Sequence, residues 1–304
     1  MDIQSFLDHL VNFRRATPET IKAYRSDLVK FGDFLKEQSI SRVTQVNAQV
    51  IKDYIVYMSE VQNPRKGRQG LSEATKARRL AAVSSYCDFV RANGHHKFAN
   101  PLENLNMRWK RNNHPKPVDE KVLDQLLGNI TSMRDRTLIT LFLASGLRIN
   151  EMWQLNRDTI EIERHIGQDS EVMYVGSGEI TGKGDKKRRF FIDSEAIVAW
   201  GKYLSTREGD DNPALFLSER KQRMSVRAMQ ERLAYWCKLA GVEHIHMHQL
   251  RHTYATRLAN ANINSMLLKE LMGHSSFTTT MQYFKLTDTT LARNYHAAME
   301  FVRK

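Results

Sequence analysis

Residues 159–163 read Thr159-Ile160-Glu161-Ile162-Glu163, an alternation of polar and apolar side chains. A period of two indicates a β-strand with one covered face. Two further segments with strand character follow at 172–175 and 189–192, and the glycine-rich stretch Gly182-Lys183-Gly184-Asp185 between them is typical of a hairpin turn. We therefore predict a small antiparallel sheet in a chain whose other patterns are helical.

Helical periodicity dominates both sides of this sheet. Thr17-Pro18 is typical of a helix start, and the apolar residues that follow it recur every three or four positions. Further helices are predicted near 47–59, from Ser72 to Gly94, over 136–147 and 149–155, and from 194 to the end of the chain. The predicted fold class is mainly α with a small antiparallel β-sheet.

A basic, proline-containing stretch divides the chain. It runs from Arg108 to Pro117, and its prolines and polar residues interrupt the helical periodicity. We predict a helical domain over 1–107, a linker over 108–117 and an α+β domain over 118–304.

The charge balance indicates a polyanionic partner. The 304 residues have a formal net charge of +12 and a pI near 9.7, and nucleic acid is the simplest matching partner. No apolar run approaches the ~20 residues of a membrane helix, and the start lacks a signal-peptide pattern. Two cysteines, Cys87 and Cys237, exclude a disulfide scaffold. We expect a cytoplasmic, nucleoid-associated protein without membrane contacts.

Nine cations in the N-terminal region and linker are candidates for phosphate contacts. Arg78 lies two residues before Leu80, so it points away from the apolar stripe that Leu80 begins. The alternative is a solvated surface on which cations cluster by chance. The nine are Arg65, Lys66, Arg68, Lys76, Arg78, Arg79, Arg108, Lys110 and Arg111.

Five short segments of the second half carry side chains suited to phosphate chemistry. They are Ala144–Glu151, Thr181–Gly184, His248–His252, Leu271–His274 and Thr280–Tyr283. Their order and residue types, with the nine-residue step from His274 to Tyr283, resemble the tyrosine recombinase (phage integrase) family. The helical domain and linker are similar to that family's core-binding, SAM-like domain. Since the first helix begins near residue 3, we expect the simple two-domain type of Xer proteins and mobile elements, without an arm-binding domain.

The resemblance implies six catalytic residues. A tyrosine hydroxyl can attack phosphorus, but its ordinary pKa near ~10 means that it requires help. Arginines suit a phosphate because a guanidinium donates two parallel hydrogen bonds. A histidine three residues before an arginine shares its helix face and suits proton transfer with the tyrosine. The six are Arg148, Lys183, His248, Arg251, His274 and Tyr283.

The family also supplies expectations for individual roles and for the assembly. Lys183 resembles the general acid for the 5′ oxygen, His274 resembles the second histidine on the phosphate, and Glu151 matches an acidic position that orients Arg148 or His248. The implied reaction cleaves and rejoins DNA through a 3′-phosphotyrosyl bond without a cofactor. Four protomers would act on double-stranded DNA with an inverted-repeat target.

The predicted C-terminal helix over 288–304 is a candidate for contacts between protomers. It carries an apolar stripe of Leu291, Tyr295, Ala298 and Val302. As in the family, we expect the stripe to dock on a neighbouring protomer. The alternative is that it packs on its own domain.

Other functions stay open at this point. The chain could be a catalytically silent DNA-binding regulator, or a type IB topoisomerase-like enzyme that relaxes DNA. His248 and His252 stand at i, i+4, which can suit zinc, and a metal-dependent nuclease is a further alternative. No cysteine lies near these histidines and no glutamate follows the first, so we predict no metal site. No Walker motif is present, so an ATP site is not expected.

Overall fold

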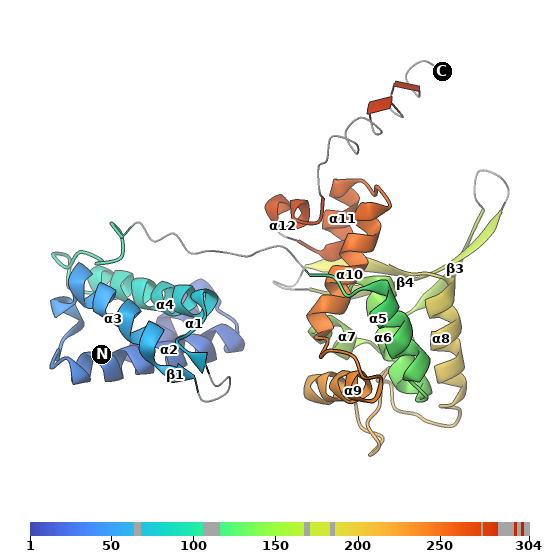
Figure 1. Ribbon diagram of the computed structural model, residues 1–304, viewed down its shortest axis with the longest axis horizontal. Helices are drawn as coiled ribbons and strands as arrows, with labels where there is room; N and C mark the ends of the chain where they lie inside the picture. Colours follow the sequence, from blue (N-terminus) through green and yellow to red (C-terminus); the bar gives the residue numbers. More distant parts are fainter. Residues whose placement is uncertain are drawn as a thin grey trace. The chain divides into compact units, whose positions relative to one another are not determined.

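The computed structural model describes residues 1–63, 68–105, 116–166, 171–182, 186–274, 276–284, 295–296 and 299–300. The chain forms two compact units, Met1–Asn112 and Asn113–Lys304 (Figure 1). Both are mainly helical, and the second contains a three-stranded antiparallel sheet, which confirms the predicted fold class. The predicted linker over 108–117 lies almost entirely outside the described residues, so its borders stay a prediction. Among the described residues, no helix combines the length and apolar character that a membrane crossing requires.

In its described residues, the first unit is built from the helices α1 (Ile3–Arg14), α2 (Pro18–Glu37), α3 (Ala48–Glu60) and α4 (Glu73–Ala92), with a 3-10 turn at Val43–Gln45. The Thr17 hydroxyl accepts from the Thr20 N–H, and Ser72 caps α4 in the same way. The predicted stripe of α4, from Leu80 to Val90, is buried in the core. Strands β1 (Gln62–Asn63) and β2 (Arg68–Gln69) pair as a short hairpin. Each strand has two residues, so an alternation of polar and apolar residues could not predict it.

The sheet of the second unit has the order β3-β4-β5. It comprises β3 (Glu161–Ile166), β4 (Val172–Thr181) and β5 (Lys187–Ile192), each longer than or shifted from the predicted segment. The β4–β5 pairing ends at Thr181 opposite Lys187. The predicted turn over 182–185 falls between these strands, and its residues 183–185 lie outside the described residues. At one end, the paired strands β3 and β4 extend beyond the helices (Figure 1).

The described helices of the second unit are α5 (Glu120–Asn129), α6 (Met133–Ser145), α7 (Ile149–Gln154), α8 (Ser194–Ser205), α9 (Val226–Leu239), α10 (Met247–Asn260), α11 (Ser265–Met272) and α12 (Phe277–Met281). Of these, α6 and α11 contact β5, and α7 and α8 contact β4. As its apolar sequence predicts, α6 is buried along most of its length, and it packs against α8 and α10.

The prediction of uninterrupted helix after residue 194 is wrong between α8 and α9. Residues 206–225 form turns and two isolated bridges, Asn156 with Ala214 and Leu217 with Arg223. The run Gly209-Asp210-Asp211-Asn212-Pro213 explains the break, because these residue types favour turns over helix. The bridge from Asn156 ties this segment to the end of α7.

Candidate active site

The corner between α6 and α7 positions the first arginine. Gly146 ends α6 with φ +58°, and a Cβ at this residue would lie 2.2 Å from the ring of Tyr254. Arg148 then caps α7: its backbone N–H donates to Oε2 of Glu151 at 2.7 Å. The Arg148 guanidinium donates to Oε1 of the same carboxylate at 2.8 Å. Glu151 therefore fixes both ends of Arg148.

The C-terminal end of α11 holds three guanidinium groups. The carbonyl oxygens of Leu271, Met272 and Gly273 accept hydrogen bonds from Arg188, Arg251 and Arg148, respectively. The Arg148 bond measures 2.9 Å, and Arg251 also donates to the carbonyl of Gly146. Carbonyls at a helix C-terminus lack helical partners and carry partial negative charge, so cations are stabilised there.

Glu151 lies at the centre of the three arginines and is 3% exposed. Arg188 donates to its Oε2 at 2.7 Å, and Nη1 of Arg251 lies 3.8 Å from the same oxygen. Burial opposes ionisation of Glu151, but Arg188 and Arg148 outweigh it and lower its pKa. Burial and the charge of Arg148 lower the pKa of Arg251 to about 9, which leaves it a cation near neutral pH. Three cations thus share one carboxylate, and the excess positive charge suits a phosphodiester.

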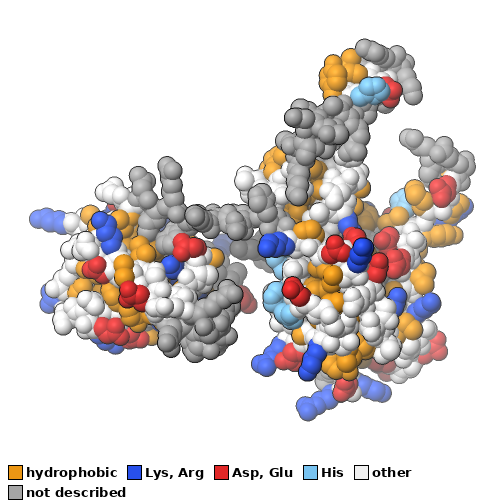
Figure 2. Space-filling view, in the orientation of Figure 1, with side chains coloured by type: hydrophobic (Ala, Val, Ile, Leu, Met, Phe, Trp, Pro, Cys, Tyr) orange, Lys and Arg blue, Asp and Glu red, His pale blue; other side chains and the backbone are white. Residues whose placement is uncertain are grey.

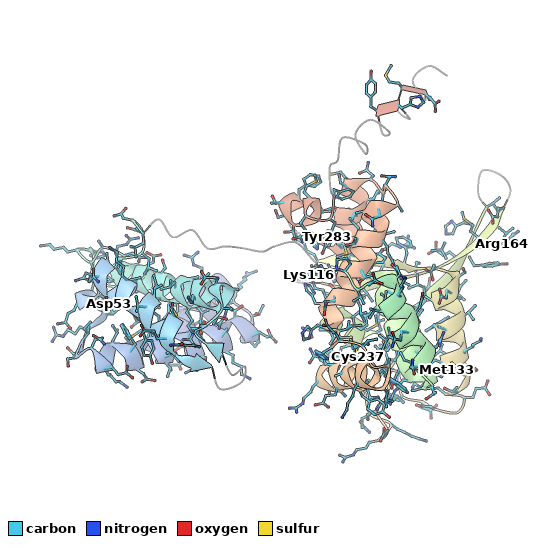
Figure 3. The ribbon with its side chains drawn as sticks, viewed as in Figure 1. Asp53, Lys116, Met133, Arg164, Cys237 and Tyr283 are labelled. Atoms are coloured by element: carbon cyan, nitrogen blue, oxygen red, sulfur yellow. The ribbon has the colours of Figure 1, made fainter. Side chains whose placement is uncertain are left out.

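Tyr283 follows the short helix α12 and lies beside α10 and α11 (Figure 3). It is 6% exposed, and its Oη lies 2.7 Å from Nδ1 of His252. The ring of His274 stacks on the tyrosine ring with a centroid distance of 6.2 Å and an interplanar angle of 13°. Burial raises the pKa of Tyr283, and Arg251 and the Gln282 side chain offset this in part. The phenol therefore keeps its proton near neutral pH.

Three histidines surround the reactive groups. His248 is exposed, and its ring meets that of His252 edge to face at 4.3 Å. Nδ1 of His274 lies 2.9 Å from Oγ1 of Thr280. Partial desolvation and nearby arginines lower the pKa of His248, and that of His274 falls to about 4 for the same reasons. Histidine atoms reach the surface of the unit, as Figure 2 shows in pale blue.

Lys183 lies outside the described residues, so its predicted role is not placed. The base of its turn is described: the Gly182 N–H donates to the carbonyl of Lys186 at 2.8 Å. A Cβ at Gly182 would lie 3.4 Å from Oε1 of Glu151. Gly182, the residue before Lys183, therefore lies at the edge of the arginine cluster.

The fold brings five of the six predicted catalytic residues, together with Glu151, into one site. Two participants were missed by the sequence analysis. His252 was weighed as a zinc ligand alone, although it lies one helical turn after His248. Arg188 lies in the basic run 186–189, and the sequence analysis did not single it out. Side chains alternate along a strand, so this pattern could have placed Arg188 on the face opposite Arg189.

The side chains that the structure describes form no candidate metal site. Over the ranges that the structure describes, no group of three or more His, Cys, Asp and Glu side chains is placed to hold a metal ion. The histidine pair of α10 instead contacts Tyr283 through its second member.

Of the nine candidate phosphate contacts, the structure describes the side chains of those on α4. Arg65, Lys66, Arg108, Lys110, Arg111 and the side chain of Arg68 lie outside the described residues. On α4, Lys76 donates to Ser59 at 2.9 Å and to Glu73 at 3.0 Å. Arg78 and Arg79 both face the buried Asp27, the first through a hydrogen bond and the second with Nε 3.6 Å from Oδ1.

These contacts leave the three α4 cations with different accessibility. Lys76 and Arg79 are 9% and 8% exposed, whereas half of the Arg78 side chain faces solvent (48%). Of these three cations, Arg78 thus reaches solvent while keeping a partner, and the phosphate contacts of all three stay a prediction.

Two family models match the chain. The phage integrase family matches residues 116–290, and the N-terminal SAM-like domain of phage integrases matches residues 3–94. The tyrosine recombinases XerC of Shigella flexneri and of Escherichia coli O157:H7 are each 29% identical over 306 residues, which cover 98% of this chain and 95% of the relative.

Solved structures share the fold. The XerH site-specific recombinase bound to its difH substrate before cleavage has a TM-score of 0.70 at 21% identity, over 97% of this chain and 84% of that one. The Tn1549 transposon integrase in complex with circular intermediate DNA has a TM-score of 0.69 at 18% identity, over 97% and 98%. A lambda integrase dimer bound to a core site gives 0.68 at 16%, over 93% and 77%.

Proposed function

Because the chain belongs to the phage integrase family and is a site-specific tyrosine recombinase, we propose that Tyr283 is the nucleophile with which it cleaves DNA. Attack of Oη on a phosphodiester would form a 3′-phosphotyrosyl bond and release a 5′-hydroxyl. A 5′-hydroxyl of another strand would then attack that bond and rejoin the DNA. The observation that carries this proposal is the position of a buried, hydrogen-bonded phenol beside three arginines that share a single carboxylate.

Arg148 and Arg251 are proposed to hold the scissile phosphate. Arg148 is the more accessible of the two, with 35% of its side chain exposed against 3% for Arg251. Preorganised donors that face developing charge are usually the largest contribution to catalysis. Glu151 would act through Arg148 as a positioning residue, since it fixes the guanidinium before DNA arrives.

The remaining roles concern protons and the phosphate oxygens. We propose Lys183 as the acid that protonates the leaving 5′ oxygen, and the position of Gly182 beside Glu151 supports it. His248, exposed and close to both arginines, and His274, stacked on Tyr283, would contact the phosphate.

The first unit and the linker are proposed to grip the duplex. Arg78 is the favoured phosphate contact on α4, and Arg65, Lys66, Arg68, Arg108, Lys110 and Arg111 would extend that surface along the backbone. Lys76 and Arg79 would join it after exchanging their internal partners for phosphates. Such an enzyme works on the nucleoid, in the cytoplasm.

We further propose that four protomers assemble on two target sites, each an inverted repeat. Half-sites in opposite orientation follow from two protomers related by a twofold axis. The C-terminal segment 288–304 would link them by docking on the neighbour, and Tyr295 within it is 68% exposed. Most of this segment lies outside the described residues.

Covalent capture tests the proposed reaction. Protein mixed with sheared DNA from its source organism and quenched in detergent is expected to retain DNA by a bond that survives a chelator. Sequencing the retained DNA should reveal one imperfect palindrome. Adducts spread over many sequences would indicate a relaxing, topoisomerase-like enzyme, and the absence of adducts despite salt-sensitive binding would indicate a silent regulator.

Deletion of residues 288–304 tests the proposed assembly. The shortened protein is expected to bind a half-site but to form no ordered multimer on DNA, as measured by mass photometry of the complexes. The full chain on the same DNA is the control. Tetramers that persist after the deletion would contradict docking by this segment.

A further inference from the structure

We infer that His252 is the base that takes the hydroxyl proton of Tyr283 during cleavage and returns it during rejoining. The inference rests on the proposed role of Tyr283 as the nucleophile. His252 is not among the six catalytic residues predicted from the sequence. The inference gives His248 and His252, which share one face of α10, different roles.

The geometry singles out His252. Its Nδ1 lies 2.7 Å from the Oη of Tyr283, within the range that a proton transfer requires. Among the described residues, no other side chain is hydrogen-bonded to this hydroxyl as an acceptor. His248, one turn earlier, contacts the ring of His252 and not the tyrosine hydroxyl, and its own ring is exposed. His248 thus faces solvent, and His252 faces the hydroxyl of Tyr283.

The protonation states set the direction of the hydrogen bond. Burial, the neighbouring His248 and the charge of Arg251 lower the pKa of His252 to about 4, so the ring is neutral near pH 7. Burial raises the pKa of Tyr283, so the phenol holds its proton. From the other side, the stacked His274 is also neutral, with a pKa of about 4. The phenol therefore donates, and the Nδ1 lone pair of His252 accepts.

A bound phosphodiester would strengthen this base. The positive charge of Arg251 is one cause of the low basicity of His252, and a phosphate anion beside Arg251 offsets that charge. The pKa of His252 should then rise toward neutrality when DNA is in place. Because proton transfer is most efficient when the pKa of the base lies near the working pH, activation of the tyrosine becomes coupled to substrate binding.

Proton transfers accompany the bond changes at phosphorus. As the bond from Oη to phosphorus forms, the Oη proton moves to Nδ1 of His252 and the bond from phosphorus to the 5′ oxygen breaks. The 5′ oxygen keeps the electron pair and takes a proton from the acid, for which Lys183 is proposed. In rejoining, the 5′-hydroxyl attacks phosphorus and gives its proton back to the deprotonated acid, the bond from phosphorus to Oη breaks, and Nδ1 returns its proton to Oη.

The test uses the full chain and a nicked target duplex that traps the covalent adduct. His252→Asn keeps a polar atom near the position of Nδ1 but cannot take a proton. Its cleavage rate at pH 7 is expected to fall by about 10²–10⁴-fold, the usual contribution of a general base. The wild-type rate should level off between pH 7 and 9, whereas the variant's rate should rise about tenfold per pH unit as hydroxide ionises the tyrosine.

A substrate with sulfur in place of the bridging 5′ oxygen distinguishes the loss of the general base from the loss of the general acid. A thiolate leaves without a proton, so this substrate should restore cleavage by Lys183→Ala but not by His252→Asn. His244→Gln is the matched control, since His244 is exposed and lies outside the site, and it should behave as wild type. DNA binding by gel shift verifies folding, and His252→Gln serves in the same assay if the asparagine variant fails to bind.

A loss of rate that is equal at every pH would mark a structural role and overturn the inference, as would rescue by the sulfur substrate or a wild-type rate in His252→Asn. Cleavage that persisted in Tyr283→Phe would instead overturn the proposed nucleophile.

Discussion

Replacement of Tyr283 by phenylalanine is expected to abolish covalent adducts while sparing the affinity for DNA. The variant removes the attacking oxygen and nothing else of the ring, so it loses a nucleophile and one hydrogen bond to His252. Loss of an enzyme nucleophile lowers the rate by as much as ~10⁶-fold. Loss of a single hydrogen bond costs only about 1 kcal/mol of stability. The measurement is the yield of protein-linked DNA on the nicked duplex, with binding followed by gel shift.

Tyr174→Phe is the matched control for this substitution. Tyr174 lies on β4 and is exposed, so removal of its hydroxyl should leave adduct formation at the wild-type level. If Tyr283→Phe still formed adducts, another hydroxyl would have to be the nucleophile, and the arrangement around Tyr283 would serve packing alone.

Arg148→Lys is expected to lower the single-turnover cleavage rate by about 10²–10³-fold, equivalent to about 2.7–4 kcal/mol of transition-state stabilisation. The guanidinium donates at once to Oε1 of Glu151 and to the carbonyl of Gly273, and a lysine ammonium has neither the reach nor the planar geometry for both. The positive charge survives the substitution, so DNA binding should change little.

The control for this variant is Arg164→Lys. Arg164 is exposed on β3, at the hairpin that extends away from Tyr283 (Figure 3). Its replacement should leave the cleavage rate at the wild-type value. A wild-type rate in Arg148→Lys would show that charge alone suffices at this position and would remove the argument for a bidentate arginine.

Periodicity predicted most of the fold because the long elements carry strong local signals. The stripe of α4 and the apolar length of α6 are both buried as predicted. Failures occurred where the pattern is short or mixed: the hairpin of β1 and β2 has two-residue strands, and the segment 206–225 combines apolar residues with turn formers. In such segments tertiary contacts, such as the bridge from Asn156 to Ala214, decide the backbone.

The candidate site was predictable as a set of residue types but not as a network. Motif order pointed to Arg148, Arg251 and Tyr283, yet it could not reveal that Arg188 shares Glu151 with both arginines. Motif order also placed His248 in the catalytic set and left His252 out, since nothing in the sequence shows that His252 lies against the hydroxyl of Tyr283. Those assignments depend on distances between segments that lie far apart in the sequence.

Because three arginines bind main-chain carbonyls at the end of α11, the residues of this segment differ in how freely their side chains can be exchanged. Main-chain oxygens stay in place when side chains are exchanged, so residues 271 and 272 can vary under packing constraints alone without releasing Arg188 or Arg251. Position 273 has no such freedom, because φ is +58° and a Cβ would lie 2.7 Å from Cδ of Arg188. Mutational libraries aimed at altered target choice can therefore randomise 271 and 272 within apolar residues, and should leave the glycine untouched.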